Sequence, residues 1–515
     1  MSLKNPEYPL TNPLCTLLNK PADEFKRADF LEIIERKKLE HITFHYTALD
    51  GRLKELKLSV STREQAELIL AEGERIDGSS LFKGMVDTSL SDMYVVPEYK
   101  TAFLNPFDKG SLDFICRYLT KEGERAPFAP DNILHKADML FQKKTDLVLN
   151  AIGELEFFLL SPREPEIFHL ERQQGYHESA PFIKSGDILN EMVYHLAQIT
   201  GAVKYSHSEV GSIDHIESDL IELRGKKAEQ LEIEFLPKPI QEMADALVMG
   251  RWIIRNVAYK YGCNATFSPK LEKGVAGNGF HFHLELLKDG KNIMRNREGE
   301  LSEHALRLLG GLCAYAESLT AFGNTQASSY MRLVPNQEAP TRIFWSDLNR
   351  SALIRVPLSW SNVSHLAKII NPQEDSDVPV LQYGQTIELR SPDGSALVHL
   401  LMAGITMAAA WGFQEDQSLE LAKKYYASED IHSDLSQLDT YPSLPTSCVE
   451  SSRLLLEKRN LYERESIFPQ SVIDFVVKLL QAENDEMIAQ KLADLPLNDR
   501  LHEIRKIMHR NLHRH

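Results

Sequence analysis

The first part of the chain alternates hydrophobic and polar residues in short runs, the pattern of half-buried β-strands. Two such runs, within residues 42–60, flank Asp50-Gly51. An Asp-Gly pair between alternating runs predicts a β-hairpin, because glycine accepts the backbone conformation of a tight turn. A further strand-like run covers Phe114–Leu119, and turn residues follow it in Gly123–Pro130. We therefore predict a polar extension over residues 1–25 and a first domain over residues 26–125.

The rest of the chain, residues 126–515, mixes strand-like runs with helical patterns. A helix is predicted over 187–200, where Leu189, Met192 and Leu196 share one face and Gly201 ends the pattern. Another is predicted from Met243 to Tyr261. The longest apolar stretch, residues 396–413, contains His399 and many small residues, so a buried helix is favoured over a membrane span. The basic amphipathic end, 500–515, predicts histidines on the solvated surface.

Composition narrows the class of protein. With 58 Lys+Arg against 74 Asp+Glu, the net charge is −16, which disfavours binding to nucleic acid or to an anionic membrane. Hydrophobic residues at 43% and charged residues at 26% are typical of a soluble globular protein. The five cysteines are scattered singly, so we expect no disulfide framework or zinc module, and a cytoplasmic location.

Common nucleotide-binding and hydrolase motifs are absent from the sequence. There is no G-x-x-x-x-G-K-[ST] loop and no G-x-S-x-G elbow, and the G-x-G at Gly277 and Gly279 is not completed to G-x-G-x-x-G because residue 282 is Phe. If ATP is used, metals and arginines must hold its phosphates.

Acidic and imidazole side chains recur at strand spacing inside apolar sequence. Glu154 and Glu156 lie two residues apart, as do His281 and His283, and Glu388 with Arg390; each pair therefore points to one face of a strand. Two like charges on one apolar face are costly unless a cation neutralises them. Each pair alone also fits a solvated edge strand. Several such strands together indicate Mg²⁺ or Mn²⁺, held by carboxylates and one imidazole.

Nine ordered blocks resemble the glutamine synthetase family, type I in layout. They are IDGSS (76–80), SDM (91–93), GELEFF (153–158), HSEVG (207–211), ATFSPK (265–270), GNGFHFH (277–283), YMRLVPNQEAP (330–340), NRSALIRVP (349–357) and IELRSPD (387–393). The resemblance implies an α+β fold, with a small β-grasp-like N-terminal domain and a large catalytic domain built on a curved antiparallel sheet flanked by helices. It also implies a homo-oligomeric ring, a dodecamer by resemblance.

The resemblance places two metal ions on acids already noted. One would be held by Glu156, Glu209 and Glu232, and the other by Glu154, His281 and Glu388. Glu232 lies 23 residues after Glu209, farther than the family pattern has it, so we assign it from its distance of 12 residues to Ala244-Asp245 and treat residues 213–227 as an insertion. Glu217, Glu222 and Glu234 are the fallback ligands.

The resemblance also assigns substrate contacts. His283, Arg350 and Arg355 match ATP-binding positions, with Arg350 also in the catalytic set. Ser80, Gly277, Arg332 and Arg390 match positions that bind the amino-acid and amine substrates. Asp77 matches the acid that deprotonates ammonium, contributed by a neighbouring subunit, and Glu338 matches the flap acid over the acyl phosphate. Taken singly, the arginines could form structural ion pairs and Asp77 could be a turn residue.

Three positions depart from the family pattern. Ala276 stands where the amino-acid loop has Asn, Thr386 stands where an arginine lies near the nucleotide phosphates, and residues 397–399 replace N-P-Y. The expected function is an ATP-dependent, Mg²⁺- or Mn²⁺-requiring ligase that joins glutamate and ammonia. Two alternatives stay open: a γ-glutamyl ligase for a larger amine, and a non-catalytic relative that binds nucleotide or glutamate.

Overall fold

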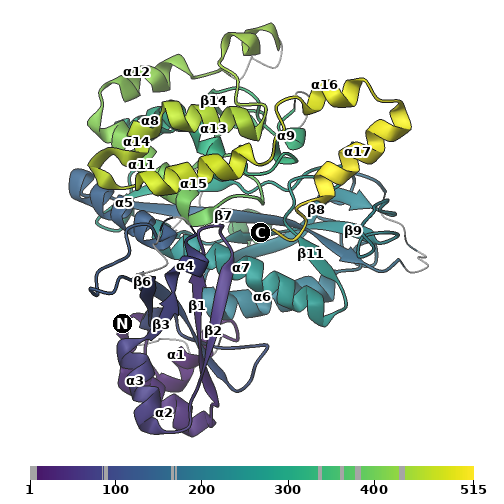
Figure 1. The fold of residues 1–515 in the computed structure, drawn as a ribbon. Helices are drawn as coiled ribbons and strands as arrows, with labels where there is room; N and C mark the ends of the chain where they lie inside the picture. Colours follow the sequence, from purple (N-terminus) through teal and green to yellow (C-terminus); the bar gives the residue numbers. More distant parts are fainter. Residues whose placement is uncertain are drawn as a thin grey trace.

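The computed structural model describes residues 8–83, 85, 91–163, 168, 171–334, 339–359, 365–376, 384–428 and 435–514. It combines a mixed N-terminal sheet, a larger antiparallel-dominated sheet and helical layers (Figure 1). The α+β prediction is confirmed.

The N-terminal sheet is built around a central parallel pair. Its strands are β1 (His41–Thr47), β2 (Leu53–Ser59), β3 (Glu74–Asp77), β4 (Asp92–Pro97), β5 (Phe103–Leu104) and β6 (Ser111–Leu119), in the order β2-β1-β6-β4-β3 with β5 beside β6. The predicted hairpin is present: β1 and β2 pair antiparallel, and Gly51 takes a φ of 81° in the turn. The accompanying helices are α1 (Pro13–Leu18), α2 (Arg27–Lys37), α3 (Arg63–Glu72) and α4 (Gly78–Leu81). Phe30 packs edge-on against Phe114 and joins α2 to the sheet.

The large sheet runs β14-β15-β16-β12-β7-β9-β8. These strands are β14 (Trp345–Asp347), β15 (Ile354–Val356), β16 (Ile387–Leu389), β12 (Phe282–Lys288), β7 (Val148–Ser161), β9 (Lys227–Phe235) and β8 (Val203–Ile213). Three short strands extend it: β10 (Lys238–Pro239) and β11 (Asn264–Thr266) beside β7, and β13 (Lys291–Asn292) beside β12. The long β7 therefore pairs with four strands: β12, β9, β10 and β11.

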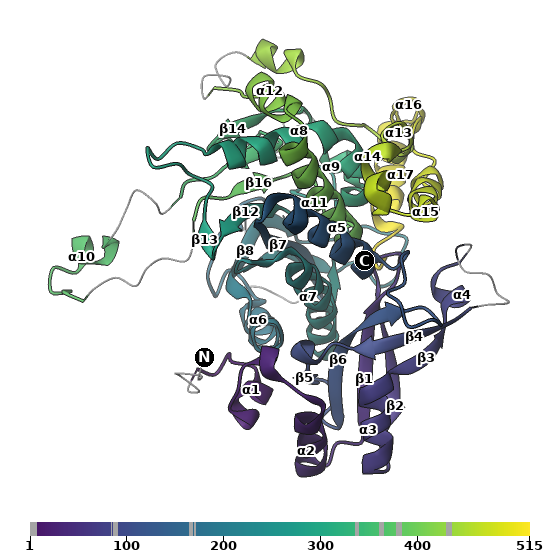
Figure 2. The ribbon, with the colours of Figure 1, turned by 90° about the vertical axis from the view of Figure 1, so that its left-hand side faces the viewer.

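Helices cover the large sheet on two sides (Figure 1). Between it and the N-terminal sheet lie α6 (Gly186–Thr200) and α7 (Ile240–Lys260), close to their predicted bounds. On the far side are α5 (Pro130–Thr145), α8 (Glu303–Gly323) and α11 (Val398–Gln414). The remaining helices are α9 (Ser329–Arg332), α10 (Leu366–Ile370), α12 (Gln417–Lys424), α13 (Cys448–Glu457), α14 (Arg459–Glu463), α15 (Gln470–Gln481), α16 (Ile488–Ala493) and α17 (Leu497–His509). Helix α10 stands away from the rest (Figure 2).

Helix α11 is the long apolar stretch of the sequence, and it is buried as predicted. Small residues allow close packing: a Cβ on Gly311 of α8 would lie 2.1 Å from the carbonyl oxygen of Ala408. No described helix combines the length and the apolar character that a bilayer crossing needs.

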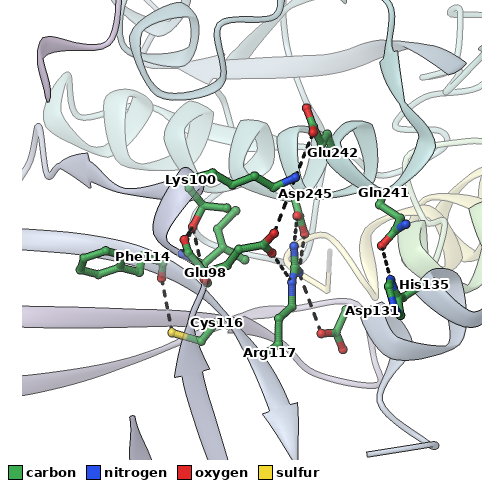
Figure 3. Close-up of polar contacts among 12 residues, drawn as sticks. Glu98, Lys100, Phe114, Cys116, Arg117, Asp131, His135, Gln241, Glu242 and Asp245 are labelled. Carbon is green, nitrogen blue, oxygen red and sulfur yellow. Dashed lines mark hydrogen bonds and ion pairs between the residues drawn. The ribbon is translucent and has the colours of Figure 1, made fainter. Parts of the chain in front are cut away.

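A cluster of ionic side chains joins the N-terminal sheet to α7 (Figure 3). Arg117 on β6 donates two hydrogen bonds to the carboxylate of Asp245, one of them at 3.0 Å from Nη1, and its Nε donates to Glu98 at 2.7 Å. Lys100 donates to Glu242 at 3.0 Å. We call this set the junction cluster: Glu98, Lys100, Arg117, Asp131, Glu242, Asp245 and His399.

The C-terminal segment corrects one prediction. His509 is 2% exposed, not solvated, and bridges Ser218 at 2.9 Å (Nδ1) and the backbone oxygen of Leu271 at 2.9 Å (Nε2). Arg505 pairs with Glu272 and Glu217 on the same two segments. His502 and His513 are exposed as predicted, so the prediction is wrong for His509, whose face of the amphipathic end packs onto the segment 213–227 and the loop after β11.

Candidate active site

Strands β7, β9 and β8 bring acids together by register. Glu156 lies opposite Glu232, and Glu154 opposite Glu234, in the antiparallel β7–β9 pair. His207 on β8 lies opposite Glu232 on its other side. Cross-strand neighbours have Cβ atoms about 5 Å apart, so these carboxylates share one face of the sheet.

On the other side of β7, β12 and the residue before it add the imidazoles of His283 and His281, and β16 adds Glu388. His281 donates from Nδ1 to Glu154 at 2.7 Å, and His283 donates from Nε2 to the other oxygen of Glu154 at 2.8 Å. Glu388 lies 3.7 Å from His281 Nδ1. Glu154 therefore sits between two imidazoles, as the spacing of two residues on each strand allows.

A glycine loop closes against the acids. The backbone N–H of Gly279 donates to Glu156 at 2.8 Å. A Cβ on Gly279 would lie 2.7 Å from both Glu156 Oε1 and His281 Nε2, so a larger residue there would displace these side chains. Gln230 donates to Glu156 at 3.1 Å and to the carbonyl of Gly277 at 3.1 Å, and so ties the loop to the sheet.

Three predicted arginines surround the same region. Arg355 donates to Glu388 at 3.0 Å, and Arg390 donates to the other oxygen of that carboxylate. Arg332 is 6% exposed and donates from Nη1 to the carbonyl of Ser391 at 3.0 Å. Its Nη2 lies 3.4 Å from His281 Nε2.

Two adjoining cavities meet at these side chains. The first, about 520 Å³, is lined by Gly277, Arg332, Arg390, Lys270 and Ala276 among others. The second, about 490 Å³, carries the acids and imidazoles together with Lys204, Tyr205, Arg355 and Thr386. Both are lined by the shared residues Glu156, Glu209, Val210, His281, Arg350 and Arg390. Among the described residues that line them, each cavity has three arginines, but the second carries seven glutamates against two in the first, and the two cavities share a wall.

The electrostatics separate the two kinds of acid. Burial and the charge of Glu209 raise the pKa of Glu156 to about 8, although Arg332 opposes this. Burial and the neighbouring Glu154 and Glu156 also raise the pKa of Glu232 well above its ordinary value. Such acids take up protons unless a cation is present.

Glu154 and Glu388 behave in the opposite way. Burial alone would raise the pKa of Glu154, but His283 and His281 outweigh it and hold that pKa well below the ordinary value. His283 and Arg390 lower the pKa of Glu388 against burial in the same way. The pKa of His283 is raised, because Glu154 outweighs its burial, whereas burial and Arg390 lower the pKa of His281.

The donor set fits a hard divalent cation. Donor atoms of Glu154, His281 and Glu388 all lie within 4.8 Å of one another, as do those of His207, Glu209 and Glu232, and those of Glu154, Glu232 and Glu234. The predicted set Glu154, His281 and Glu388 is therefore brought together. Of the other predicted set, Glu209 and Glu232 group with His207. Glu156, the third member, is the direct cross-strand neighbour of Glu232 but is not in that group.

Some predicted residues lie elsewhere. Asp77 and Ser80 are exposed at the end of β3, where Ser80 donates to Asp77 at 2.7 Å, and they line neither cavity. Hydrogen bonds from Ser79 and Ser80 lower the pKa of Asp77. The fallback acids Glu217 and Glu222 lie on the segment between β8 and β9, facing Arg505 and His513. Glu338 lies outside the described residues.

The structure adds three residues that the sequence patterns did not single out. His207 groups with the metal-ligand candidates, Gln230 ties Glu156 to the glycine loop, and Lys204 donates to Glu234 at 2.6 Å. Period-two spacing could have indicated two of them, since His207 is two residues from Glu209 and Gln230 is two residues from Glu232; Lys204 has no such spacing.

The three departures from the family pattern have different surroundings. Ala276 lines the first cavity, and Thr386 lines the second, where its hydroxyl lies 3.2 Å from His283 Nδ1. His399 lines neither cavity: it is 3% exposed at the start of α11 and contacts Asp245 at 3.1 Å. The third departure thus belongs to the junction cluster.

Comparisons with known proteins agree over most of the chain. Family models described as "Glutamine synthetase, beta-Grasp domain" and "Glutamine synthetase, catalytic domain" match residues 38–121 and 128–494. The glutamine synthetase of Pyrococcus horikoshii is 32% identical over 380 residues, covering 73% of this chain and 75% of that protein.

Among solved structures, Plasmodium falciparum glutamine synthetase superposes with a TM-score of 0.71 at 22% identity, over 92% of this chain and 98% of that one. Apo GmaS superposes with a TM-score of 0.69 at 20% identity, with the same coverage. Identities this low show a shared fold.

Proposed function

The chain belongs to the glutamine synthetase family and is a ligase of that type, and we propose that it forms glutamine from glutamate and ammonia. In the proposed reaction the γ-carboxylate of glutamate attacks the γ-phosphorus of ATP and releases ADP. Ammonia then attacks the acyl phosphate, phosphate leaves, and the nitrogen loses a proton.

The observation that carries this proposal is the common wall between two cavities, one lined by basic side chains with few acids and the other rich in carboxylates. Arg332 and Arg390 offer guanidinium groups to a substrate carboxylate on one side. The acids and imidazoles of β7, β9, β12 and β16 lie on the other. A phosphoryl group transferred between the two substrates would have to pass at this wall, where Arg350 and Arg390 border both cavities.

We assign the metal sites to the two predicted sets of ligands. Glu154, His281 and Glu388 would hold one Mg²⁺ or Mn²⁺, and Glu156, Glu209 and Glu232 the other. Carboxylate oxygens with one imidazole suit these cations. When bound, the cations supply neutralisation of the charge on the phosphoryl group.

Other side chains act on the substrates directly. We assign His283, Arg350 and Arg355 to the ATP phosphates, and Arg332, Arg390 and the backbone at Gly277 to the amino acid. Asp77 would accept a proton from ammonium, and Ser80 holds its carboxylate in place. Because Asp77 and Ser80 are exposed on the N-terminal sheet, this role requires a neighbouring subunit, and we propose a homo-oligomeric ring. Glu338 stays a prediction for the flap.

One observation favours a second candidate, a γ-glutamyl ligase for a larger amine. Ala276 lines the amino-acid cavity and is smaller than the Asn of the family pattern, so the cavity has more room there. His399, in contrast, is removed from both cavities and gives no reason to alter the substrate.

Phosphate release from ATP with Mg²⁺ or Mn²⁺ and glutamate tests both candidates, with ammonia compared against methylamine, longer alkylamines and polyamines. Ammonia-dependent release with glutamine formed supports the proposal. Release with a larger amine alone moves the assignment to the second candidate. ATP binding without release under any condition favours a non-catalytic relative.

A further inference from the structure

A third, smaller cavity lies where the hairpin turn of the N-terminal sheet, helix α7 and the C-terminal tail meet. Its volume is about 240 Å³. Arg52 comes from the turn between β1 and β2, Arg251 and Arg255 from α7, and His513 from the tail. The end of the chain lies beside α7 and this hairpin (Figure 1), and Arg52 donates from Nε to the backbone oxygen of Arg514 at 3.0 Å. No acidic residue is among the described residues that line the cavity.

Two of these guanidinium groups, those of Arg251 and Arg255, have buried N–H donors without a hydrogen-bond acceptor among the described residues. Arg251 is 3% exposed; it donates to the backbone oxygens of Ala396 (3.1 Å) and Gly394 (3.0 Å), while its buried Nε has no hydrogen-bond partner among the described residues. The buried Nη2 of Arg255 likewise has none within the described chain. Buried donors are normally satisfied, so each orphan nitrogen needs an explanation.

An aromatic ring and three acids offset part of the positive charge around this cavity. The Arg255 guanidinium lies over the ring of Phe267, 4.9 Å from its centroid, which stabilises the cation but accepts no N–H in the plane of the fork. Asp50 lies 3.7 Å from Arg52, and Glu222 lies 3.8 Å from His513. The charge of Asp393 acts on Arg251 and favours its protonated form. None of these carboxylates reaches Arg255.

The arginines also act on one another. Burial, and then the charge of Arg255, lower the pKa of Arg251 to about 9. Burial and the charge of Arg52 lower the pKa of Arg255 to about 10. Cations that disfavour each other in a closed space are stabilised by an anion between them.

We propose that this cavity binds a small oxyanion, held by the guanidinium groups of Arg255 and Arg52 with Arg251 beneath it. Guanidinium groups match phosphate and carboxylate oxygens through paired N–H donors. The volume suits inorganic phosphate, sulfate or a short dicarboxylate and is below the range usual for nucleotide-sized ligands.

The site is connected to the candidate active site through Arg251. Its two hydrogen bonds fix the backbone at 394 and 396, immediately after Arg390 and Asp393, and its guanidinium lies 5.1 Å from the ring centroid of Phe280 in the glycine loop. An anion that repositions Arg251 therefore alters the amino-acid cavity. This step rests on the proposed function.

Isothermal titration of inorganic phosphate into the full chain tests the binding site. The buffer contains EDTA and no nucleotide, so the result does not depend on turnover. We expect one phosphate per chain, with affinity reduced tenfold or more by Arg255→Gln and severalfold by Arg52→Gln. Lys260→Gln removes a cation from the exposed end of the same helix and should leave affinity unchanged.

Further variants and ligands separate the possible outcomes. Arg350→Gln, in the candidate active site, should leave phosphate affinity unchanged. The proposal is overturned if Arg350→Gln loses phosphate binding while Arg255→Gln keeps it. It is also overturned if the wild type binds no phosphate. Arg52 is half-exposed, so Arg52→Gln keeps the test valid if Arg255→Gln fails to fold. Titrations with sulfate and succinate decide between inorganic oxyanion and dicarboxylate.

The coupling has its own readout. Saturating anion should change the KM for the carboxylate substrate at least twofold in the wild type and leave it unchanged in Arg255→Gln. Binding without a change in KM would remove the coupling step and leave the site, whereas loss of catalysis in all variants would count against the proposed function alone.

Discussion

Two groups of buried ionic side chains dominate this molecule, and they differ in how their charge is balanced. In the junction cluster, Asp245 accepts two hydrogen bonds from Arg117, and Glu242 accepts one from Lys100. The second group, the strand cluster, has six acids close together on one face of the large sheet. It consists of Glu154, Glu156, Glu209, Glu232, Glu234, Glu388, His281 and His283.

The pKa values show the consequence. Burial would raise the pKa of Asp245, but Arg117 and His399 outweigh it and hold that pKa well below the ordinary range. The pKa of Glu156 is instead raised to about 8. Buried acids that the protein does not neutralise, such as Glu156 and Glu232, imply an external cation, whereas neutralised acids such as Asp245 imply a structural role. The comparison therefore separates a functional cluster from a structural one.

The largest expected effect comes from removing an acid of the strand cluster. Glu232→Gln should lower the rate of phosphate release about 10³-fold, because a lost metal ligand removes several kcal/mol of charge stabilisation. Stability in EDTA should stay equal or rise slightly, since repulsion from Glu154 and Glu156 is relieved. Steady-state kinetics and thermal denaturation measure the two effects. Glu55→Gln on the exposed face of β2 is the matched control, and full activity in Glu232→Gln would remove its assignment as a ligand.

Replacing an acid by its amide in the junction cluster should lower the free energy of unfolding and leave activity nearly unchanged. Asp245→Asn removes the carboxylate that accepts two hydrogen bonds from Arg117 and should cost about 3 kcal/mol. The midpoint of urea unfolding measures this loss, and phosphate release per folded molecule should remain within a few-fold of the wild type. If Asp245→Asn unfolds at the wild-type midpoint, the cluster does not secure the junction.

Metal removal sharpens the contrast further. A cation at about 100 times its dissociation constant stabilises the folded chain by about 2.7 kcal/mol, provided that the unfolded chain does not bind it. Wild type and Asp245→Asn should gain this increment on adding Mg²⁺ after EDTA treatment, while Glu232→Gln should gain less. Equal increments in all three proteins would place the cation outside the strand cluster.

The difference between the clusters also explains which features the sequence could predict. Glu154 with Glu156, and His281 with His283, share faces because strand geometry repeats every two residues, a local property. The pairing of Arg117 with Asp245 spans 128 residues and depends on how two sheets dock, which no local pattern contains. The spacing of His207 from Glu209 places both on one face of β8, but the position of His207 opposite Glu232 depends on the β8–β9 register, which is set across the segment 213–227.

The chain end shows the same limit. Its basic and apolar residues were predicted to form an amphipathic end, and α17 has one buried face that includes Ile504 and Met508. The partner of that face, the loop after β11, is brought there only by the tertiary fold, so His509 was wrongly assigned to the surface. Domain limits at residues 25 and 125 stay predictions, although a sheet change occurs between β6 and β7.

The smallest effect concerns Asp131, the one acid of the junction cluster that resembles the strand cluster. Both of its oxygens are buried without a hydrogen-bond partner among the described residues, and Arg117 is 3.9 Å away. Burial raises the pKa of Asp131 despite Arg117. Between the unfolded pKa near 3.9 and the raised folded pKa, the folded state binds more protons, so wild-type stability falls as pH rises through that window.

Asp131→Asn lacks this loss, and its stability relative to wild type should therefore rise with pH. We expect little difference below about pH 4 and a gain of about 0.5–1 kcal/mol at pH 7. Urea unfolding of both proteins between pH 4 and 8 measures the trend, with Asp146→Asn at the exposed end of α5 as the control. A variant that becomes less stable than wild type as pH rises would show that ionised Asp131 is a net stabilising partner of Arg117, and would make the junction cluster balanced at every acid.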